Sequence, residues 1–163
     1  MNFTFEHLKL EYQEEVICIL NYYIKETTFA YREKIVENQH FLKFLDSEEI
    51  YCGFAIKTNQ DEIVGYCLLE PYASYSTFSE VAEATYFIHP EYTNKGIGTL
   101  ALKKLEDEAK KRGIKKLLVN ISSKNIKCIK FHKKNGFIEY GRLEDIGKKF
   151  DKYFSVVWMG KEI

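Results

Sequence analysis

One stretch of this 163-residue chain, residues 80–99, constrains its fold more than any other. An apolar, β-rich segment ends at Pro90, and Gly96-Ile97-Gly98 then opens a helical pattern. Backbone N–H groups at a helix N-terminus have no intrahelical acceptors, and the helix dipole is positive there. Glycines let a phosphate approach this backbone closely. The stretch therefore predicts a strand–loop–helix junction that binds a phosphate-bearing ligand, with Glu83 on the strand beside it.

The same glycines also fit the dinucleotide fingerprint G-x-G-x-x-G/A, which would end at Ala101. In that motif the glycines follow the first strand directly, and an acidic residue ~20 positions further on binds the ribose. Here residues 89–95 intervene, and residues 120–123 hold no carboxylate. The phosphate loop G-x-x-x-x-G-K-[ST] does not occur either. The context therefore argues against a dinucleotide and leaves another phosphate ligand to be identified.

Charge and composition argue against several functions. The chain has 24 basic and 24 acidic residues, so it lacks the basic excess of most nucleic-acid-binding proteins. No apolar run approaches the ~20 residues that span a bilayer, and the N-terminus shows no signal-peptide pattern. The cysteines and histidines are scattered, without disulfide or metal-site spacing. We therefore expect a cytoplasmic protein with reduced thiols, no bound metal, and no membrane or nucleic-acid partner.

Hydrophobic periodicity predicts elements in the order β-α-α-β-β-β-α-β-α-β-β. No composition shift marks a boundary, so residues 1–163 are predicted to form one α/β (α+β) domain, with a central mixed sheet flanked by helices. A loop containing glycine and lysine is expected between the last two strands. Strands are predicted at residues 3–10, 51–57, 63–69, 80–89, 116–121, 137–142 and 153–159, and helices at 11–25, 34–45, 98–112 and 126–135.

Two motifs make the chain resemble a known family. Thr93-Asn94-Lys95-Gly96-Ile97-Gly98 matches a loop written Q/R-x-x-G-x-G/A at both glycines and departs from it at the first position. Asn125 before a helix, then Phe131-His132 and Gly136-Phe137, match the second motif. With the element order, these motifs resemble the GNAT superfamily of N-acetyltransferases over nearly the whole chain. The resemblance implies that the loop binds acetyl-CoA, with the pyrophosphate held largely by backbone N–H groups.

Within that superfamily the chain is most similar to phosphinothricin acetyltransferase-like enzymes. Their strand Ala-Glu-[Ser/Asp]-[Ser/Thr]-[Val/Ile]-Tyr-Val resembles residues 82–88, and their loop Thr-x-x-Phe-Arg-Thr resembles residues 28–33. His132 matches the histidine of their last helix, where many other members have tyrosine. Two departures bear on the substrate. The basic residues that these enzymes carry after the Gly-Tyr strand are missing from residues 71–76, and their loop asparagine is Ala30.

The resemblance also implies where the co-substrate acetyl-CoA binds. Family members splay the strand that carries Glu83 from the following strand, and the pantetheine arm pairs with the exposed backbone. Asn125 is predicted both to cap its helix and to touch the pantetheine, and these two roles are compatible. The full set of residues predicted to bind acetyl-CoA is Tyr86, Phe87, Ile88, Asn94, Lys95, Gly96, Ile97, Gly98, Thr99 and Asn125.

Acetyl transfer to an amine needs a base for the amine and a proton for the leaving thiolate. Most primary amines are protonated at neutral pH, and a carboxylate near the acetyl group can take that proton directly or through a water. Glu83 is the predicted base; the alternative is a solvated or ion-paired strand residue. His132 is the predicted proton donor to the thiolate; the alternative is a surface histidine on an amphipathic helix.

The acceptor is predicted to be the primary amine of a small molecule, such as an amino-acid analogue of the phosphinothricin or methionine sulfoximine type. Phe29, Tyr31, Arg32 and Tyr75 are the predicted acceptor-binding residues, and ordinary loop packing is the alternative for each. A protein or peptide N-acetyltransferase and a non-catalytic acyl-CoA sensor remain open as other functions. Relatives in this subgroup are often homodimers, and the final strands, with Trp158, would supply an aromatic interface.

Overall fold

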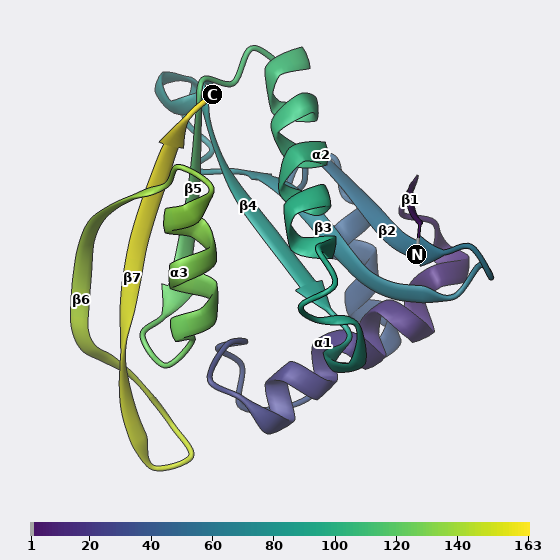
Figure 1. The fold of residues 1–163 in the computed structure, drawn as a ribbon, viewed down its shortest axis with the longest axis horizontal. Coiled ribbons are helices and arrows are strands. Elements are labelled where there is room, and N and C mark those ends of the chain that lie inside the picture. The colour runs from purple at the N-terminus through teal and green to yellow at the C-terminus, as the bar shows by residue number, and fades with distance from the viewer. Residues whose placement is uncertain (1) are drawn as a thin grey trace.

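The computed structural model describes residues 2–163 and is built around one seven-stranded sheet in the order β1-β2-β3-β4-β5-β7-β6 (Figure 1). Among the strand pairs of these residues, β4 and β5 run parallel and the other five pairs run antiparallel. The strands are β1 (Phe3–His7), β2 (Cys52–Thr58), β3 (Ile63–Pro71), β4 (Val81–Ile88), β5 (Lys116–Ser122), β6 (Ile138–Lys149) and β7 (Lys152–Glu162).

Helices cover both faces of the sheet. Figure 1 shows α2 (Ile97–Lys111) and α3 (Ile126–Lys134) in front of it and α1 (Gln13–Glu26) behind it. Each face buries its own apolar core, because side chains along a strand alternate between the two faces. The core under α2 and α3 includes Leu105, Leu117 and Met159, and the core under α1 includes Ile17 and Tyr66. Short 3₁₀ turns lie at Leu10–Tyr12, Asn38–Leu45, Ser76–Phe78 and Pro90–Tyr92.

The predicted order of strands and helices is confirmed, but the helix expected at residues 34–45 is wrong. Only Asn38–Leu45 is helical, and it is a 3₁₀ helix. The Asn21 side chain of α1 donates to the Val36 carbonyl and accepts from the Val36 N–H, both at 2.8 Å. Residue 36 therefore bonds to α1 rather than to its own helical turn, a pairing over 15 positions that local periodicity does not reveal.

The loop expected between the last two strands is also wrong. β6 continues to Lys149 and pairs with β7 as a long hairpin, with a shift of register between Leu143 and Gly147. The two residues at its tip, Phe150 and Asp151, have positive φ angles of 55° and 56°. Two-residue hairpins favour this backbone but normally use Asn-Gly or Asp-Gly. The tip therefore lacked the usual sequence signal.

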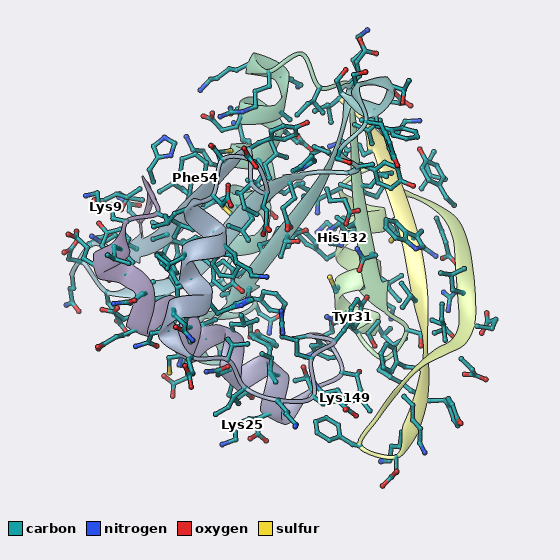
Figure 2. All side chains as sticks on the ribbon, turned by 180° about the vertical axis from the view of Figure 1, so that it is seen from behind. Lys9, Lys25, Tyr31, Phe54, His132 and Lys149 are labelled. Atoms are coloured by element: carbon teal, nitrogen blue, oxygen red, sulfur yellow. The ribbon has the colours of Figure 1, made fainter. Side chains whose placement is uncertain are left out.

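The β6–β7 hairpin holds the loop that follows α1. Lys149 is buried, and its Nζ donates to the Ala30 carbonyl at 2.7 Å. The ring of Tyr31 stacks on Phe154 of β7 with centroids 5.7 Å apart. In Figure 2 the labelled Tyr31 and Lys149 mark this meeting of hairpin and loop. The segment predicted to contact the acceptor is thus fixed by residues more than a hundred positions away.

No helix within residues 2–163 combines the length and the hydropathy that crossing a membrane requires.

Candidate active site

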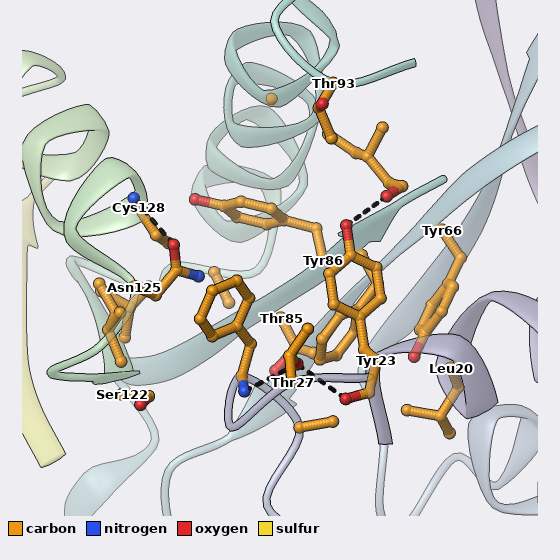
Figure 3. Close-up of a pocket in the computed structure, with 18 of the residues that line it drawn as sticks. Leu20, Tyr23, Thr27, Tyr66, Thr85, Tyr86, Thr93, Ser122, Asn125 and Cys128 are labelled. Atoms are coloured by element: carbon orange, nitrogen blue, oxygen red, sulfur yellow. Dashed lines mark hydrogen bonds between the residues drawn. The ribbon is translucent and has the colours of Figure 1, made fainter. Parts of the chain in front are cut away.

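The site is a gap in the sheet between its two parallel strands. β4 and β5 pair at three positions only, from Val81 opposite Lys116 to Glu83 opposite Leu118. Beyond Glu83, β4 runs on to Ile88 and β5 to Ser122 without pairing to each other. A cleft of about 940 Å³ fills this gap and extends from the N-terminus of α2 to the loop after α1 (Figure 3). The strand splay that the family resemblance implied is therefore present.

One end of the cleft is the N-terminus of α2. Asn94 and Gly96 have positive φ angles of 62° and 81°, and these angles let the backbone turn from the loop into α2. Within the described residues, the N–H groups of Gly96, Ile97 and Gly98 donate to no acceptor. Asn94, Gly96, Gly98 and Thr99 line the cleft. A Cβ on Gly98 would lie 3.4 Å from the Phe131 ring, so a side chain there would narrow the cleft.

Two residues of the predicted loop set do not contact the cleft through their side chains. Ile97 is buried in the core under α2, where it can offer only its backbone N–H. The Lys95 ammonium lies 4.5 Å above the Tyr92 ring rather than in the cleft. The loop thus presents backbone donors and no side-chain cation. This arrangement suits a pyrophosphate, which a positive helix end and free N–H groups stabilise.

The middle of the cleft is lined by the unpaired halves of the two strands and by α3. Tyr86, Phe87 and Ile88 line it from β4. The Ile88 carbonyl accepts a hydrogen bond from the Tyr23 hydroxyl of α1 at 2.6 Å, which fixes the end of β4 (Figure 3). Asn125 lines the opposite wall, and its Oδ1 accepts from the Cys128 N–H at 3.2 Å. Asn125 therefore caps α3 while it faces the cleft.

Glu83 lies at the last paired position of β4, where the strands part. Its Oε2 accepts a hydrogen bond from Asn120 Nδ2 of β5 at 3.0 Å. Burial, and then the charge of Glu70, raise the pKa of Glu83 to about 7, against the opposing hydrogen bond from Asn120. A carboxyl group with this pKa exchanges protons near neutral pH, as a general base must.

Glu83 itself does not form part of the cleft wall. Its chain neighbour Ala84, its cross-strand neighbour Glu70 and its partner Asn120 do. Strand alternation turns Glu83 toward α1 and Tyr86 toward α2 and α3. Glu83 and Tyr86 can both act on a ligand in this cleft because the cleft passes through the sheet. A proton from a bound amine would therefore reach Glu83 through a water or after a small side-chain movement.

His132 is buried at 2% exposure and lines the cleft from α3. Its Nδ1 lies 2.8 Å from the Cys128 carbonyl oxygen, which can only accept, so Nδ1 carries the proton. Its Nε2 then accepts from the Tyr86 hydroxyl, and the two rings stack. Burial lowers the pKa of His132 to about 4, against the opposing Cys128 carbonyl. The imidazole is therefore neutral at physiological pH, and its Nε2 is occupied by the hydrogen bond from the Tyr86 hydroxyl.

The other end of the cleft is an aromatic chamber under α1. Phe29, Tyr31 and Arg32 line it, as the sequence predicted. Tyr75 does not: its side chain is 71% exposed, on the turn that precedes β4. Figure 2 shows Tyr31 and His132 on the same side of the opening. The sequence analysis missed several lining residues, namely Phe44, Tyr66, Glu70, Asn120 and Cys128.

Part of this set was predictable from the alternation of side chains along β3. Tyr66, Leu68 and Glu70 alternate along β3 and share the face toward α1 with Glu83. Their alternation was readable from the sequence, but the register that sets Glu70 opposite Glu83 was not. In the part of the chain that the structure describes, no three His, Cys, Asp or Glu side chains are placed to hold a metal ion.

The parted parallel strands and the helix N-terminus with free N–H groups match the donor site of the acyl-CoA-dependent transferases that the sequence resembles. The model of the acetyltransferase (GNAT) family matches residues 16–137, and the chain belongs to this family. The protein is thus an acetyl-CoA-dependent N-acetyltransferase, as the sequence motifs predicted.

Two curated relatives and one solved structure illustrate the similarity. The chain is 23% identical to the L-methionine sulfoximine/L-methionine sulfone acetyltransferase of Salmonella typhimurium, over 86% of this chain and 83% of the relative. It is 24% identical to the phosphinothricin N-acetyltransferase of Streptomyces coelicolor, over 86% and 84%. The phosphinothricin acetyltransferase of Sinorhizobium meliloti, solved in complex with acetyl-CoA, superposes with a TM-score of 0.93 at 16% identity, over 100% of this chain and 89% of that one.

Proposed function

We propose that this protein transfers the acetyl group of acetyl-CoA directly to the primary amine of a small amino-acid-like molecule, and that residues 1–163 act as one domain. The observation that carries this proposal is the cleft through the sheet, which joins the free N–H groups of α2 to a chamber lined by aromatic side chains past Glu83. A concave, mostly apolar chamber with a few polar groups is typical of a site for a small molecule. The names of the curated relatives, which act on amino acids and their analogues, support the same acceptor class.

The donor would bind along the gap between β4 and β5. The N–H groups of Gly96, Ile97 and Gly98 would hold its pyrophosphate, and the unpaired backbone of β4 would pair with its pantetheine arm. Side chains that line this path and would contact the donor are Tyr86, Phe87, Ile88, Asn94, Thr99 and Asn125. Lys95 would contribute through its backbone and its charge.

Glu83 is the proposed base. An ordinary glutamate would be a poor proton acceptor for an amine, since their pKa values differ by about 6. The raised pKa of Glu83, about 7, narrows this difference and makes the transfer less uphill. The neutral amine then attacks the thioester carbonyl carbon. The carbon–sulfur bond breaks, and its electron pair leaves with the sulfur toward the middle of the cleft, which His132 lines from α3.

The acceptor would lie in the chamber beside Phe29, Tyr31 and Arg32. Arg32 makes no ion pair with any residue among 2–163, so its guanidinium is available to the carboxylate of an amino acid. The position where the related enzymes carry asparagine, Ala30, is buried at 6% exposure and offers no polar group.

Release of the CoA thiol over a panel of acceptors tests the proposed function. The panel holds neutral L-amino acids, methionine sulfoximine, methionine sulfone, phosphinothricin, polyamines and short peptides. We expect release with an amino acid or its sulfone or sulfoximine, and little with peptides. Activity confined to peptides would overturn the acceptor class. Thermal stabilisation by acetyl-CoA without release on any acceptor would favour an acyl-CoA sensor.

Catalysis is expected to depend on pH through Glu83. The carboxylate is the form that accepts a proton, so kcat/KM for the acceptor should fall as the pH decreases through about 7. The His132 imidazole stays neutral over this range and should not contribute a second change. A pH profile of kcat/KM from pH 4 to 9 measures this limb. A limb near the ordinary glutamate value of 4.5 would contradict the assignment.

We further propose a cytoplasmic location and a homodimer, with neither nucleic acid nor membrane as a partner. The argument for a dimer is the apolar surface of the edge hairpin. Ile138, Tyr140, Ile146 and Tyr153 are each more than half exposed along β6 and β7. Exposed apolar side chains gathered on an edge strand are typical of an interface.

A further inference from the structure

Glu70 and Glu83 face each other across β3 and β4. The antiparallel register sets them directly opposite, and both side chains point toward α1. Directly opposed residues on such strands have Cβ atoms about 4.5–5.5 Å apart, so their carboxyl groups can contact one shared group. Glu70 lines the cleft at the point where β4 and β5 part.

Within residues 2–163, no cationic side chain neutralises these two carboxyl groups. Neither forms an ion pair with a lysine, arginine or histidine of residues 2–163. The polar groups around them are neutral. Asn120 of β5 donates a hydrogen bond to Glu83, and Thr85 of β4 forms a hydrogen bond with Glu70 that opposes the rise in its pKa caused by burial. Tyr31 of the loop lies within electrostatic range of Glu83, and Tyr66 of β3 lies within electrostatic range of Glu70.

Like charges directly opposite in a sheet destabilise it, and half-buried charges destabilise it more. Such a pair is relieved by a shared proton or by a cation between the two groups. Elsewhere in this chain a buried carboxylate is matched: Glu108 is held by Lys104, Lys111 and Arg112. Glu70 and Glu83 thus differ from Glu108 because no ion pair among the described residues neutralises them. A cation from outside the protein can reach them through the open cleft beside them.

We propose that Glu70 is a specificity-determining residue, which with Glu83 binds the ammonium group of the acceptor. This inference rests on the proposed function. The ammonium enters beside Glu70, and one N–H bond breaks as its proton passes to a Glu83 oxygen through a water or after a small movement of the Glu83 side chain. The freed lone pair forms the bond to the acetyl carbon, and the carbon–sulfur pair leaves with the CoA sulfur. The second proton that the nitrogen loses passes to this thiolate, so the products are the amide and the CoA thiol. The charge of Glu70 raises the pKa of Glu83 and so keeps Glu83 basic, while burial raises the pKa of Glu70 itself.

The position of Glu70 also restricts the rest of the acceptor. It comes directly before residues 71–76, where the similar enzymes carry basic residues and this chain carries none. A second anionic group at this end of β3 would therefore meet the Glu70 carboxylate and no cation from residues 71–76. The site should prefer amino acids with a neutral side chain, such as methionine sulfone, over phosphinothricin, whose side chain is an anionic phosphinate.

The test compares the wild type with Glu70→Gln, which keeps the shape and removes the charge. We expect KM for methionine sulfone to rise ~10-fold, as a lost charge-assisted hydrogen bond implies. The acid limb of kcat/KM should move to lower pH, since Glu83 loses a like charge. The preference for methionine sulfone over phosphinothricin should shrink, and KM for acetyl-CoA should stay unchanged. Glu80→Gln is the matched control, because Glu80 is an exposed carboxylate paired with Lys115.

An unchanged acceptor KM and an unchanged acid limb in Glu70→Gln would overturn the inference and leave the proposed function standing. A fall in melting temperature together with a rise in acetyl-CoA KM would assign Glu70 a structural role and overturn it as well. If the wild type acetylates no amine, the proposed function fails. The carboxyl pair is then tested by NMR titration of Glu83 in both proteins, where an identical Glu83 pKa would refute the coupling.

Discussion

Replacing Glu83 with glutamine is expected to lower kcat by roughly 10²–10⁴-fold, the usual contribution of a general base. Glutamine has the same shape and can still accept the hydrogen bond from Asn120 through its amide oxygen. It cannot take the proton of the attacking amine. The donor site lies further along the cleft, at the N-terminus of α2, so KM for acetyl-CoA should hardly change.

Steady-state kinetics with both substrates varied, together with a melting curve, measures this effect. The melting temperature should not fall, because Glu83→Gln removes the repulsion between Glu83 and Glu70. Glu80→Gln again serves as the control for a carboxylate on the same strand region. If acetyl-CoA binding weakened as much as kcat, or if kcat stayed at the wild-type value, Glu83 would not be the base.

Replacing Thr99 with glutamate is expected to raise KM for acetyl-CoA by about two orders of magnitude or more, as facing like charges imply. Thr99 is the third residue of α2, is exposed, and lines the cleft beside the free N–H groups. A carboxylate here would face the pyrophosphate. In the free protein the same carboxylate would interact favourably with the positive end of the helix dipole. The melting temperature should therefore stay the same or rise slightly.

The opposite signs of these two effects make the experiment decisive. Acetyl-CoA KM and the melting temperature of the free protein are measured for Thr99→Glu and for Thr99→Gln, which has the same size without the charge. We expect only the glutamate variant to lose the donor. Equal KM values in the two variants would mean that the pyrophosphate does not lie at the N-terminus of α2.

Features that depend on short stretches of chain were predictable from the sequence. The junction at Gly96-Ile97-Gly98 follows from glycine, proline and helix periodicity within twenty residues, and the structure has it with a positive φ at Gly96. Asn125 caps α3 as its residue type and position indicated. The strand that carries Glu83, the order of the elements and the family all follow from such local patterns.

Features that depend on distant partners were not predictable. The pairing of Asn21 with Val36 keeps the start of the expected helix out of helical form, and the helical segment begins only at Asn38. The hydrogen bond from Lys149 to the Ala30 carbonyl fixes the loop after α1. Lys149 belongs to the β6–β7 hairpin, part of which was expected to be a loop. The side chain of Tyr75, expected at the acceptor, lies exposed instead.

The chemistry of the site shows the same division. The sequence by itself predicted Glu83 and His132 as residues of one site, because each belongs to a local motif. Only the tertiary structure decided that Tyr86 contacts Nε2 of His132, that Glu70 opposes Glu83, and that β4 and β5 part beyond Glu83. Propensity and periodicity specify which face of an element is apolar. Strand register and the gap between two strands are set by all the elements that pack on them at once, so no single stretch of sequence encodes them.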